Sequence, residues 1–241
     1  QHLRHRPGWS LGLGDDTVRA ILRDRSGLVW LATDSGVNIH DATQTALRTV
    51  LGLPGVAGGE RVEIGALLQA GDGRLWLGTQ KQGVAVLDAS GGPTTHLRPD
   101  RQRPETALPE DIVLALVEGL QGEVWIATKR GLYRARADGS GLQRVTLAGR
   151  HPSAAIWALL RQGSLLWVGG ATDGLWSLDL TTGRTQHVAH QTHDDAAWRL
   201  TDDRVSVLAA APGDGLWVGT RQGLDRIDPA RGAVGRWLAS R

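Results

Sequence analysis

The sequence predicts an all-β fold assembled from five copies of one four-stranded unit. Three observations support this prediction. A Trp-centred motif recurs five times, an apolar run precedes each copy, and a glycine follows each copy. No segment shows a helical period, so every unit is expected to consist of strands and turns alone. The anchoring tryptophans are 46, 49, 42 and 50 residues apart: Trp30, Trp76, Trp125, Trp167 and Trp217.

Each unit is expected to begin with a buried inner strand. A short apolar run that ends at a Gly-containing turn is typical of a strand covered on both faces. The five runs are "VRAILRD", "EIGALLQ", "IVLALVE", "AIWALLR" and "VSVLAAA".

The Trp strand follows, and its aromatic residue explains why the motif repeats. A Trp between two packed sheets can bury roughly 150–250 Å². At about 25 cal/mol per Å² this corresponds to an upper bound of roughly 4–6 kcal/mol. The residue two positions later is always small and lies on the same strand face, where it makes room for a neighbour: Ala32, Gly78, Ala127, Gly169 and Gly219.

A third strand begins at a glycine that supplies a turn with an unusual φ, and a more polar fourth strand ends the unit. The glycines are Gly36, Gly83, Gly131, Gly174 and Gly223. The polar runs are "ALRTVL", "TTHLRP", "LQRVTL", "TQHVAH" and "AVGRWL". Polarity therefore rises from the first strand to the fourth, as in a sheet with one central and one peripheral edge. Radial repetition of such sheets is a β-propeller.

Composition bounds the function only loosely. The 241 residues carry a net charge of +2, which argues neither for nor against nucleic acid, and no nucleic-acid partner is expected. Lys81 and Lys129 are the only lysines among the 27 basic residues. The absence of Cys excludes disulfides and thiolate chemistry. No apolar run approaches 18 residues, so no membrane-spanning segment is expected within the chain. The absence of Met suggests a processed or excised segment.

The repeat, written D-x-x-G-x-[LV]-W-[LVI]-[GA]-T-x-x-G-[LV], resembles that of the two-component regulator propeller family. The resemblance is best seen at residues 24–41 and 213–228 and extends over all five units. It implies a periplasmic or extracytoplasmic sensor domain that precedes a membrane segment and a histidine kinase or diguanylate cyclase. Some members respond to carbohydrates. The family has no fixed catalytic motif, so the resemblance carries over no functional residue.

We expect one domain, residues 1–241, with units at about 15–51, 60–98, 109–148, 151–190 and 202–239. Residues 1–6 align with a rim strand that either closes the ring or belongs to another blade. The family typically has seven blades, so five units fit either a five-bladed ring or a fragment of a seven-bladed propeller. A closed five-bladed ring is favoured because closure removes exposed sheet edges.

A ligand is expected at the loops of one face, because loops carry function on a rigid scaffold. The turns after the Trp strands and the long connections between units share a face, and an anionic small molecule or carbohydrate would suit their cations. The alternative is that these are solvated turn residues and that each loop Trp packs under its own loop. The candidates are Trp9, Lys81, Lys129, Arg130, Trp198, Arg221 and Gln222.

No cofactor or catalytic residue is predicted. His190, His193 and Asp194 are weak metal candidates, because residues three apart in a strand point to opposite faces. Two further functions stay open: a propeller lyase of the streptogramin-lyase type, which would use groups such as His151, Glu110 and Glu118, and a pure protein-interaction scaffold. An adjacent receptor domain and a second copy of the chain are possible partners.

Overall fold

The structure is a computed structural model that describes residues 13–41, 47–50, 62–89, 92–103, 107–151, 154–190, 199–228 and 233–237. These residues form five antiparallel sheets of four strands, here called blades 1 to 5. The all-β propeller architecture predicted from the repeat is therefore confirmed. In every blade the strands pair in chain order, so each blade is a simple meander.

The strand bounds follow the five repeats. Blade 1 contains β1 (Val18–Arg23), β2 (Val29–Thr33), β3 (Gly36–His40) and β4 (Leu47–Val50). Blade 2 contains β5 (Ile64–Gln69), β6 (Leu75–Thr79), β7 (Val84–Leu87) and β8 (Pro93–Leu97). Blade 3 contains β9 (Val113–Glu118), β10 (Val124–Thr128), β11 (Gly131–Ala135) and β12 (Gln143–Val145). Blade 4 contains β13 (Ile156–Gln162), β14 (Leu165–Gly170), β15 (Leu175–Asp179) and β16 (Thr185–Val188). Blade 5 contains β17 (Val205–Ala210), β18 (Leu216–Thr220), β19 (Gly223–Asp228) and β20 (Ala233–Trp237).

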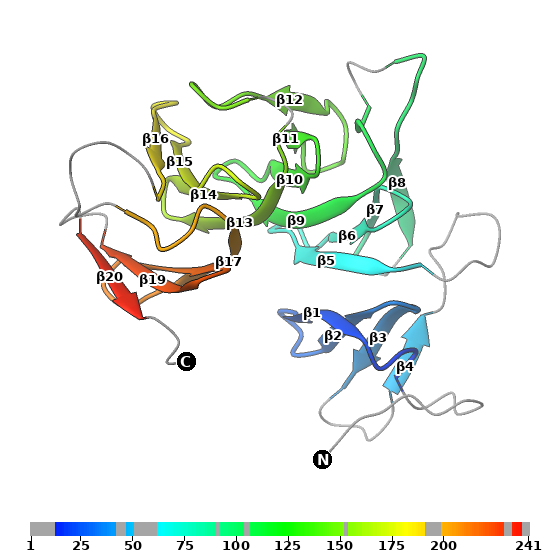
Figure 1. The fold of residues 1–241 in the computed structure, drawn as a ribbon. Helices are drawn as coiled ribbons and strands as arrows, with labels where there is room; N and C mark the ends of the chain where they lie inside the picture. Colours follow the sequence, from blue (N-terminus) through cyan, green and yellow to red (C-terminus); the bar gives the residue numbers. More distant parts are fainter. Residues whose placement is uncertain are drawn as a thin grey trace.

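The blades are arranged around a common centre (Figure 1). The first strand of each blade lies innermost, and the fourth lies at the periphery. Consecutive inner strands β1, β5, β9, β13 and β17 contact one another, whereas β17 and β1 have no comparable contact. Residues 1–6, the expected closing strand, lie outside the described residues.

The turn between the second and third strands is built as the repeat predicts. Gly83 has a φ of +72°, and a Cβ added there would lie 2.1 Å from the carbonyl oxygen of Leu97. The backbone conformation and the close approach both require glycine. The Thr that ends the Trp strand closes this turn, as when Thr79 Oγ1 donates to the Gly83 carbonyl at 3.0 Å. Three other blades make the same bond, from Thr33, Thr128 and Thr220.

Every inner strand has a register shift near its start, a feature that the apolar pattern did not predict. In blade 4 the shift lies between Ile156 and Ala158, and the skipped residue is Trp157. A bulge re-aims the side chain that it leaves unpaired. This explains why Trp157 is 37% exposed although its neighbours Ile156 and Ala158 are buried. The equivalent shifts of the other inner strands lie between Val18 and Ala20, Ile64 and Ala66, Val113 and Ala115, and Val205 and Val207.

The core consists of separate apolar layers between neighbouring blades. Trp76, Trp125 and Trp167 are buried in the layers that join blades 2/3, 3/4 and 4/5. In blades 1 to 4 the small residue two positions after the Trp packs with a β-branched residue of the next blade. A Cβ at Gly78 would lie 2.7 Å from Val113 Cγ1, so the glycine leaves just enough room for that valine.

Hydrogen bonds also join the blades at the end where the first and second strands meet. Arg25 donates to Gln69 Oε1 and links blades 1 and 2, and Gly71 donates to Glu118 Oε1 and links blades 2 and 3. Arg161 donates to the Glu118 carbonyl and links blades 3 and 4. Gln162 donates to the Gly215 carbonyl and links blades 4 and 5. We call these bonds the inter-blade belt.

A buried leucine anchors the connector that precedes several inner strands, five residues before the first strand residue. Leu13, Leu108 and Leu200 hold this position ahead of Val18, Val113 and Val205. The residue after the leucine differs among the connectors, and the third strand differs with it.

Where the residue after the anchoring leucine has a backbone N–H group, a side chain of the third strand accepts a hydrogen bond from it. Thr201 donates through its N–H and hydroxyl to the buried carboxylate of Asp225, and Gly14 donates to Asn38 Oδ1. In blade 3 the residue is Pro109, which has no N–H, and the third strand carries Tyr133 instead.

Candidate ligand-binding site

The predicted cations lie in turns of three different blades. Lys81 of blade 2 forms an ion pair with Glu63, with Nζ 2.6 Å from Oε1. In blade 5 the Gln222 side chain donates to Asp202 Oδ2 at 3.0 Å. The exposed residues Lys129 and Arg130 belong to the blade 3 turn, and the exposed Arg221 to the blade 5 turn. Neither of the two pockets described below brings these residues together.

The remaining predicted ligands fall elsewhere. Trp9, Trp198, His193 and Asp194 lie outside the described residues. The backbone N–H of His190 donates to Asp203 Oδ1, and its ring Nδ1 lies 2.8 Å from the Leu200 carbonyl oxygen. Across the described part of the chain, no three His, Asp or Glu side chains gather closely enough to hold a metal ion.

A basic residue on the rim strand holds the turn of its own blade in three blades. His96 Nε2 lies 2.6 Å from the carbonyl oxygen of Gln82, and His187 Nε2 lies 2.7 Å from that of Asp173. Arg144 donates to the carbonyl of Arg130 at 2.9 Å. The signal in the sequence is a basic residue just before the apolar residue in each of these three rim strands. Sequence reasoning overlooked it because the rim strands were regarded only as polar.

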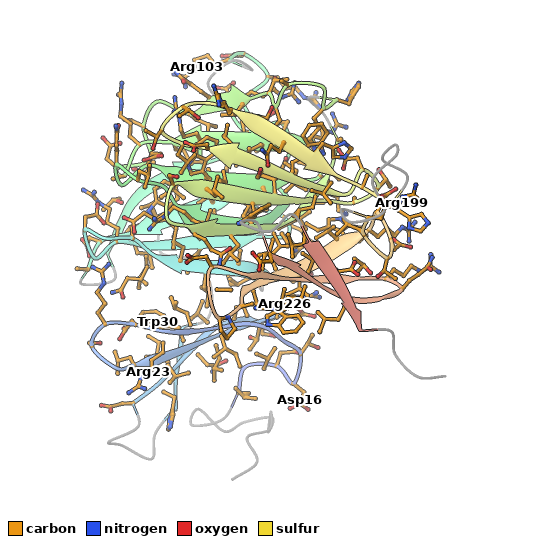
Figure 2. The ribbon with its side chains drawn as sticks, turned by 90° about the vertical axis from the view of Figure 1, so that its left-hand side faces the viewer. Asp16, Arg23, Trp30, Arg103, Arg199 and Arg226 are labelled. Carbon is orange, nitrogen blue, oxygen red and sulfur yellow. The ribbon has the colours of Figure 1, made fainter. Side chains whose placement is uncertain are left out.

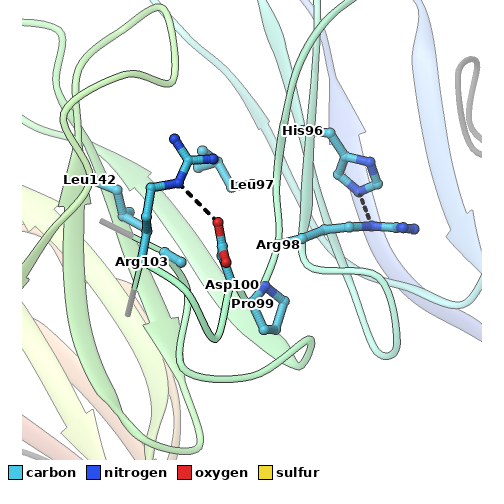
Figure 3. A pocket seen from close by; sticks show the side chains of 8 residues that line it. His96, Leu97, Arg98, Pro99, Asp100, Arg103 and Leu142 are labelled. Atoms are coloured by element: carbon cyan, nitrogen blue, oxygen red, sulfur yellow. Dashed lines mark hydrogen bonds and ion pairs between the residues drawn. The ribbon is translucent and has the colours of Figure 1, made fainter. Parts of the chain in front are cut away.

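The pocket nearest to the predicted kind of site lies between blades 2 and 3, beside the long connection that follows β8 (Figure 3). Its volume is about 360 Å³, within the range of small-molecule sites. It is lined by His96, Leu97, Arg98, Pro99, Asp100, Arg103, Ala107 and Leu142. We call it the connector pocket.

Local hydrogen bonds shape the connector around this pocket. Asp100 accepts the backbone N–H of Gln102 at 2.8 Å and the Arg103 Nε–H at 3.0 Å. The backbone bond and the Arg103 guanidinium keep the pKa of Asp100 below its usual value. Pro99 pairs with Leu108 in an isolated parallel bridge, which brings the two ends of the loop together. The carboxylate therefore stays ionised and fixes the turn.

His96 is a neutral member of the pocket. Burial lowers the pKa of its imidazole, and the nearby Arg98 charge lowers it further, although the Gln82 carbonyl opposes both effects. A carbonyl oxygen can only accept, so Nε2 carries the hydrogen that it gives to Gln82. Arg98 Nε, 3.3 Å from the same nitrogen, consequently finds no strong acceptor there.

The connector pocket combines an apolar floor with a basic rim. Ala107 and Leu142 are buried beneath it, whereas Arg98 and Arg103 are exposed at its edge. Asp100 neutralises Arg103, but no carboxylate of the described residues forms an ion pair with Arg98. Such a site can bind a small anion through a guanidinium while it covers an apolar part of the ligand.

A second pocket, of about 470 Å³, lies between blades 3 and 4 at the end that carries the inter-blade belt. Arg134 stands over the Trp125 ring at 5.7 Å, and the Trp125 indole donates to Glu123. The lining is mainly polar: Leu120, Gln121, Glu123, Arg134, Ala135, Arg136, Gly141, Gln143, Leu180 and Thr181. Its two arginines are satisfied in part by Gln143 and Ser140, each at 3.4 Å.

The fold defines the chain as a five-bladed β-propeller. The family model described as "Two component regulator propeller" matches residues 12–35. The match covers the connector, β1 and the Trp strand of blade 1. No curated protein matches the chain significantly.

Solved structures share the fold at low identity. An extracellular domain of a putative hybrid two-component system from B. thetaiotaomicron is 20% identical with a TM-score of 0.74, over 99% of this chain and 32% of that one. An inactive virginiamycin B lyase from Staphylococcus aureus with quinupristin is 14% identical with a TM-score of 0.65, over 91% and 69%. PorZ of Porphyromonas gingivalis, a surface component of the type-IX secretion system, is 18% identical with a TM-score of 0.64, over 90% and 32%. The chain thus spans about a third of the first of these structures. No helix among the described residues has the length and apolar character needed to cross a membrane.

Proposed function

We propose that the chain is a non-catalytic ligand-sensing propeller of a bacterial extracytoplasmic receptor, and that the connector pocket binds its ligand. The repeat and the similarity to an extracellular receptor domain support the sensor role. The observation that carries the choice of site is Arg98, an exposed guanidinium without a carboxylate partner beside an apolar floor. The expected ligand is a small organic anion, such as an acidic sugar.

A ligand in the connector pocket could also change the relative position of blades 2 and 3. Its walls come from the rim strand of blade 2, the connector and the buried Leu142 of blade 3. A ligand that bridges these parts would favour one relative position of the two blades, because a ligand shifts an equilibrium by its differential affinity for the two states. An adjacent receptor domain that contacts this face would detect the change.

The test is binding of a panel of organic anions, for example glucuronate and galacturonate against glucose and galactose, by calorimetry. Arg98→Gln should weaken binding of an anionic ligand by about tenfold or more, since charge-assisted hydrogen bonds contribute about 1.5–3 kcal/mol. Arg101→Gln is the matched control, because Arg101 is exposed in the same connector but does not line the pocket. Equal losses in both variants, or anion binding that neither variant alters, would refute the assignment.

A further inference from the structure

The side of blade 5 that should face a following blade is uncovered. Leu224 is the second residue of its third strand and is 38% exposed, whereas the equivalent residues of blades 1 to 4 are at most 4% exposed: Val37, Val84, Leu132 and Leu175. Val207 on the inner strand is 56% exposed. We call the surface formed by Val207, Trp217, Gly219 and Leu224 the leading face of blade 5. Arg226, above the Trp217 ring, lies on the side of the blade that is turned toward blade 1 (Figure 2).

The opposite side of blade 1 is uncovered in the same way. Val18 is 39% exposed, whereas the equivalent residues of the other four blades are completely buried: Ile64, Val113, Ile156 and Val205. Ile21 on the same strand is 68% exposed. We call the surface of Val18 and Ile21 the trailing face of blade 1.

These two faces are the two halves of an interface that the molecule already makes four times. At each internal junction a β-branched residue of the inner strand packs against a small residue of the preceding Trp strand, as Val113 does against Gly78 and Val205 against Gly169. The unpartnered halves are Val18 and Gly219. No apolar cluster of the described residues joins blade 5 to blade 1.

The leading face of blade 5 departs from the others at one position, where Val207 replaces the alanine of the other blades. Its Cγ1 atom lies 2.4 Å from the place that a Cβ on Gly219 would occupy. The Val207–Gly219 pair therefore presents an apolar surface close to that of the Ala20–Ala32 pair in blade 1. The substitution keeps the surface suitable for a β-branched residue.

We propose that a second copy of this chain docks head to tail at this interface, with Val18 of one copy against Gly219 and Val207 of the other. Because the two faces differ, the contact is heterologous. Each dimer would keep one free face of each kind, so association continues with rising concentration.

Mixed variants give a sharp test. Val18→Asp destroys the trailing face and leaves the leading face intact, and Val207→Asp does the reverse. Both positions are exposed, so the fold should survive, which circular dichroism and thermal melting would check. By analytical ultracentrifugation the unmodified chain should associate, each variant alone should sediment as a monomer, and an equimolar mixture should form a heterodimer and nothing larger.

Leu120→Asp serves as the control, because Leu120 is 45% exposed and lies on neither face. It should associate as the unmodified chain does. The proposal would be overturned by an unmodified chain that stays monomeric at every concentration, as expected if further blades of a longer polypeptide cover these faces. Association that persists in Val18→Asp, or a mixture that stays monomeric, would overturn it as well.

Discussion

The four internal junctions and the junction between blades 5 and 1 are built from the same repeat, yet only the internal ones are sealed. A sealed junction has a Trp that is buried in blades 2 to 4 and partly buried in blade 1, a small residue that receives a β-branched side chain, and a bond of the inter-blade belt. At blades 5 and 1 the same residue types are present, but Val18 and Leu224 are exposed. The difference shows that the motif supplies half an interface, and that its stabilising effect depends on the neighbour.

The largest expected effect tests whether the repeated Trp stabilises only a sealed junction. Trp76→Ala should lower the free energy of unfolding by about 3–5 kcal/mol, because the side chain is fully buried. Trp217→Ala should cost less than half as much, since the ring is only partly buried beneath Arg226. Urea unfolding of the two variants measures the contrast. Equal losses would mean that the motif stabilises its own blade rather than the junction.

Two glycine substitutions compare a sealed junction with the open one at the small residue that stands two positions after the Trp. Gly78→Ala should destabilise the protein by about 1–3 kcal/mol, because the added Cβ meets Val113 of the next blade and Ala66 of its own. Gly219→Ala meets only Val207, which is exposed and can change rotamer, so its effect should be within about 0.5 kcal/mol. Thermal melting at low protein concentration would distinguish them. A costly Gly219→Ala would indicate a junction that is sealed in solution.

The inter-blade belt offers a smaller effect. Glu118→Ala removes the acceptor of the Gly71 N–H and should cost about 1–2 kcal/mol. Glu123→Ala is a comparison within one turn, because Glu123 bonds only groups of blade 3, Trp125 and Gln121. Hydrogen exchange at the Gly71 amide should accelerate in Glu118→Ala and stay unchanged in Glu123→Ala. Faster exchange of the Gly71 amide in both variants would mean that the bond to Glu118 does not by itself protect this amide.

The smallest effect concerns pH at the outer part of the junction between blades 2 and 3. Burial lowers the pKa of His96 in the folded protein below its ordinary value. The unfolded chain then binds the proton more readily, so stability is lost as the pH falls from about 6.5 toward the folded pKa. His96→Gln should reduce this loss between pH 7.5 and 5.5, as followed by urea unfolding. An unchanged pH dependence would contradict it.

The sequence was sufficient for the blades because their determinants are local. Trp, the small residue after it and the turn glycine stand at fixed spacings, and the structure places each as predicted. The belt and the His96 and Arg144 contacts were missed because they join residues that lie far apart in the chain or on strands judged only by polarity. The connector pocket depends on how one irregular loop folds over Leu142, which no repeat specifies. Trp9 and Trp198 remain predictions.

The connector residue after each anchoring leucine limits how such a protein can grow by duplication. Thr201 and Asp225 satisfy one another, while Pro109 makes an acceptor unnecessary opposite Tyr133. A copied sheet that acquired a foreign connector could bury an N–H group or a carboxylate with no partner, at a cost of about 1–3 kcal/mol or more. A duplicated segment keeps the connector N–H group and its third-strand acceptor together only if it begins at the leucine, five residues before the inner strand.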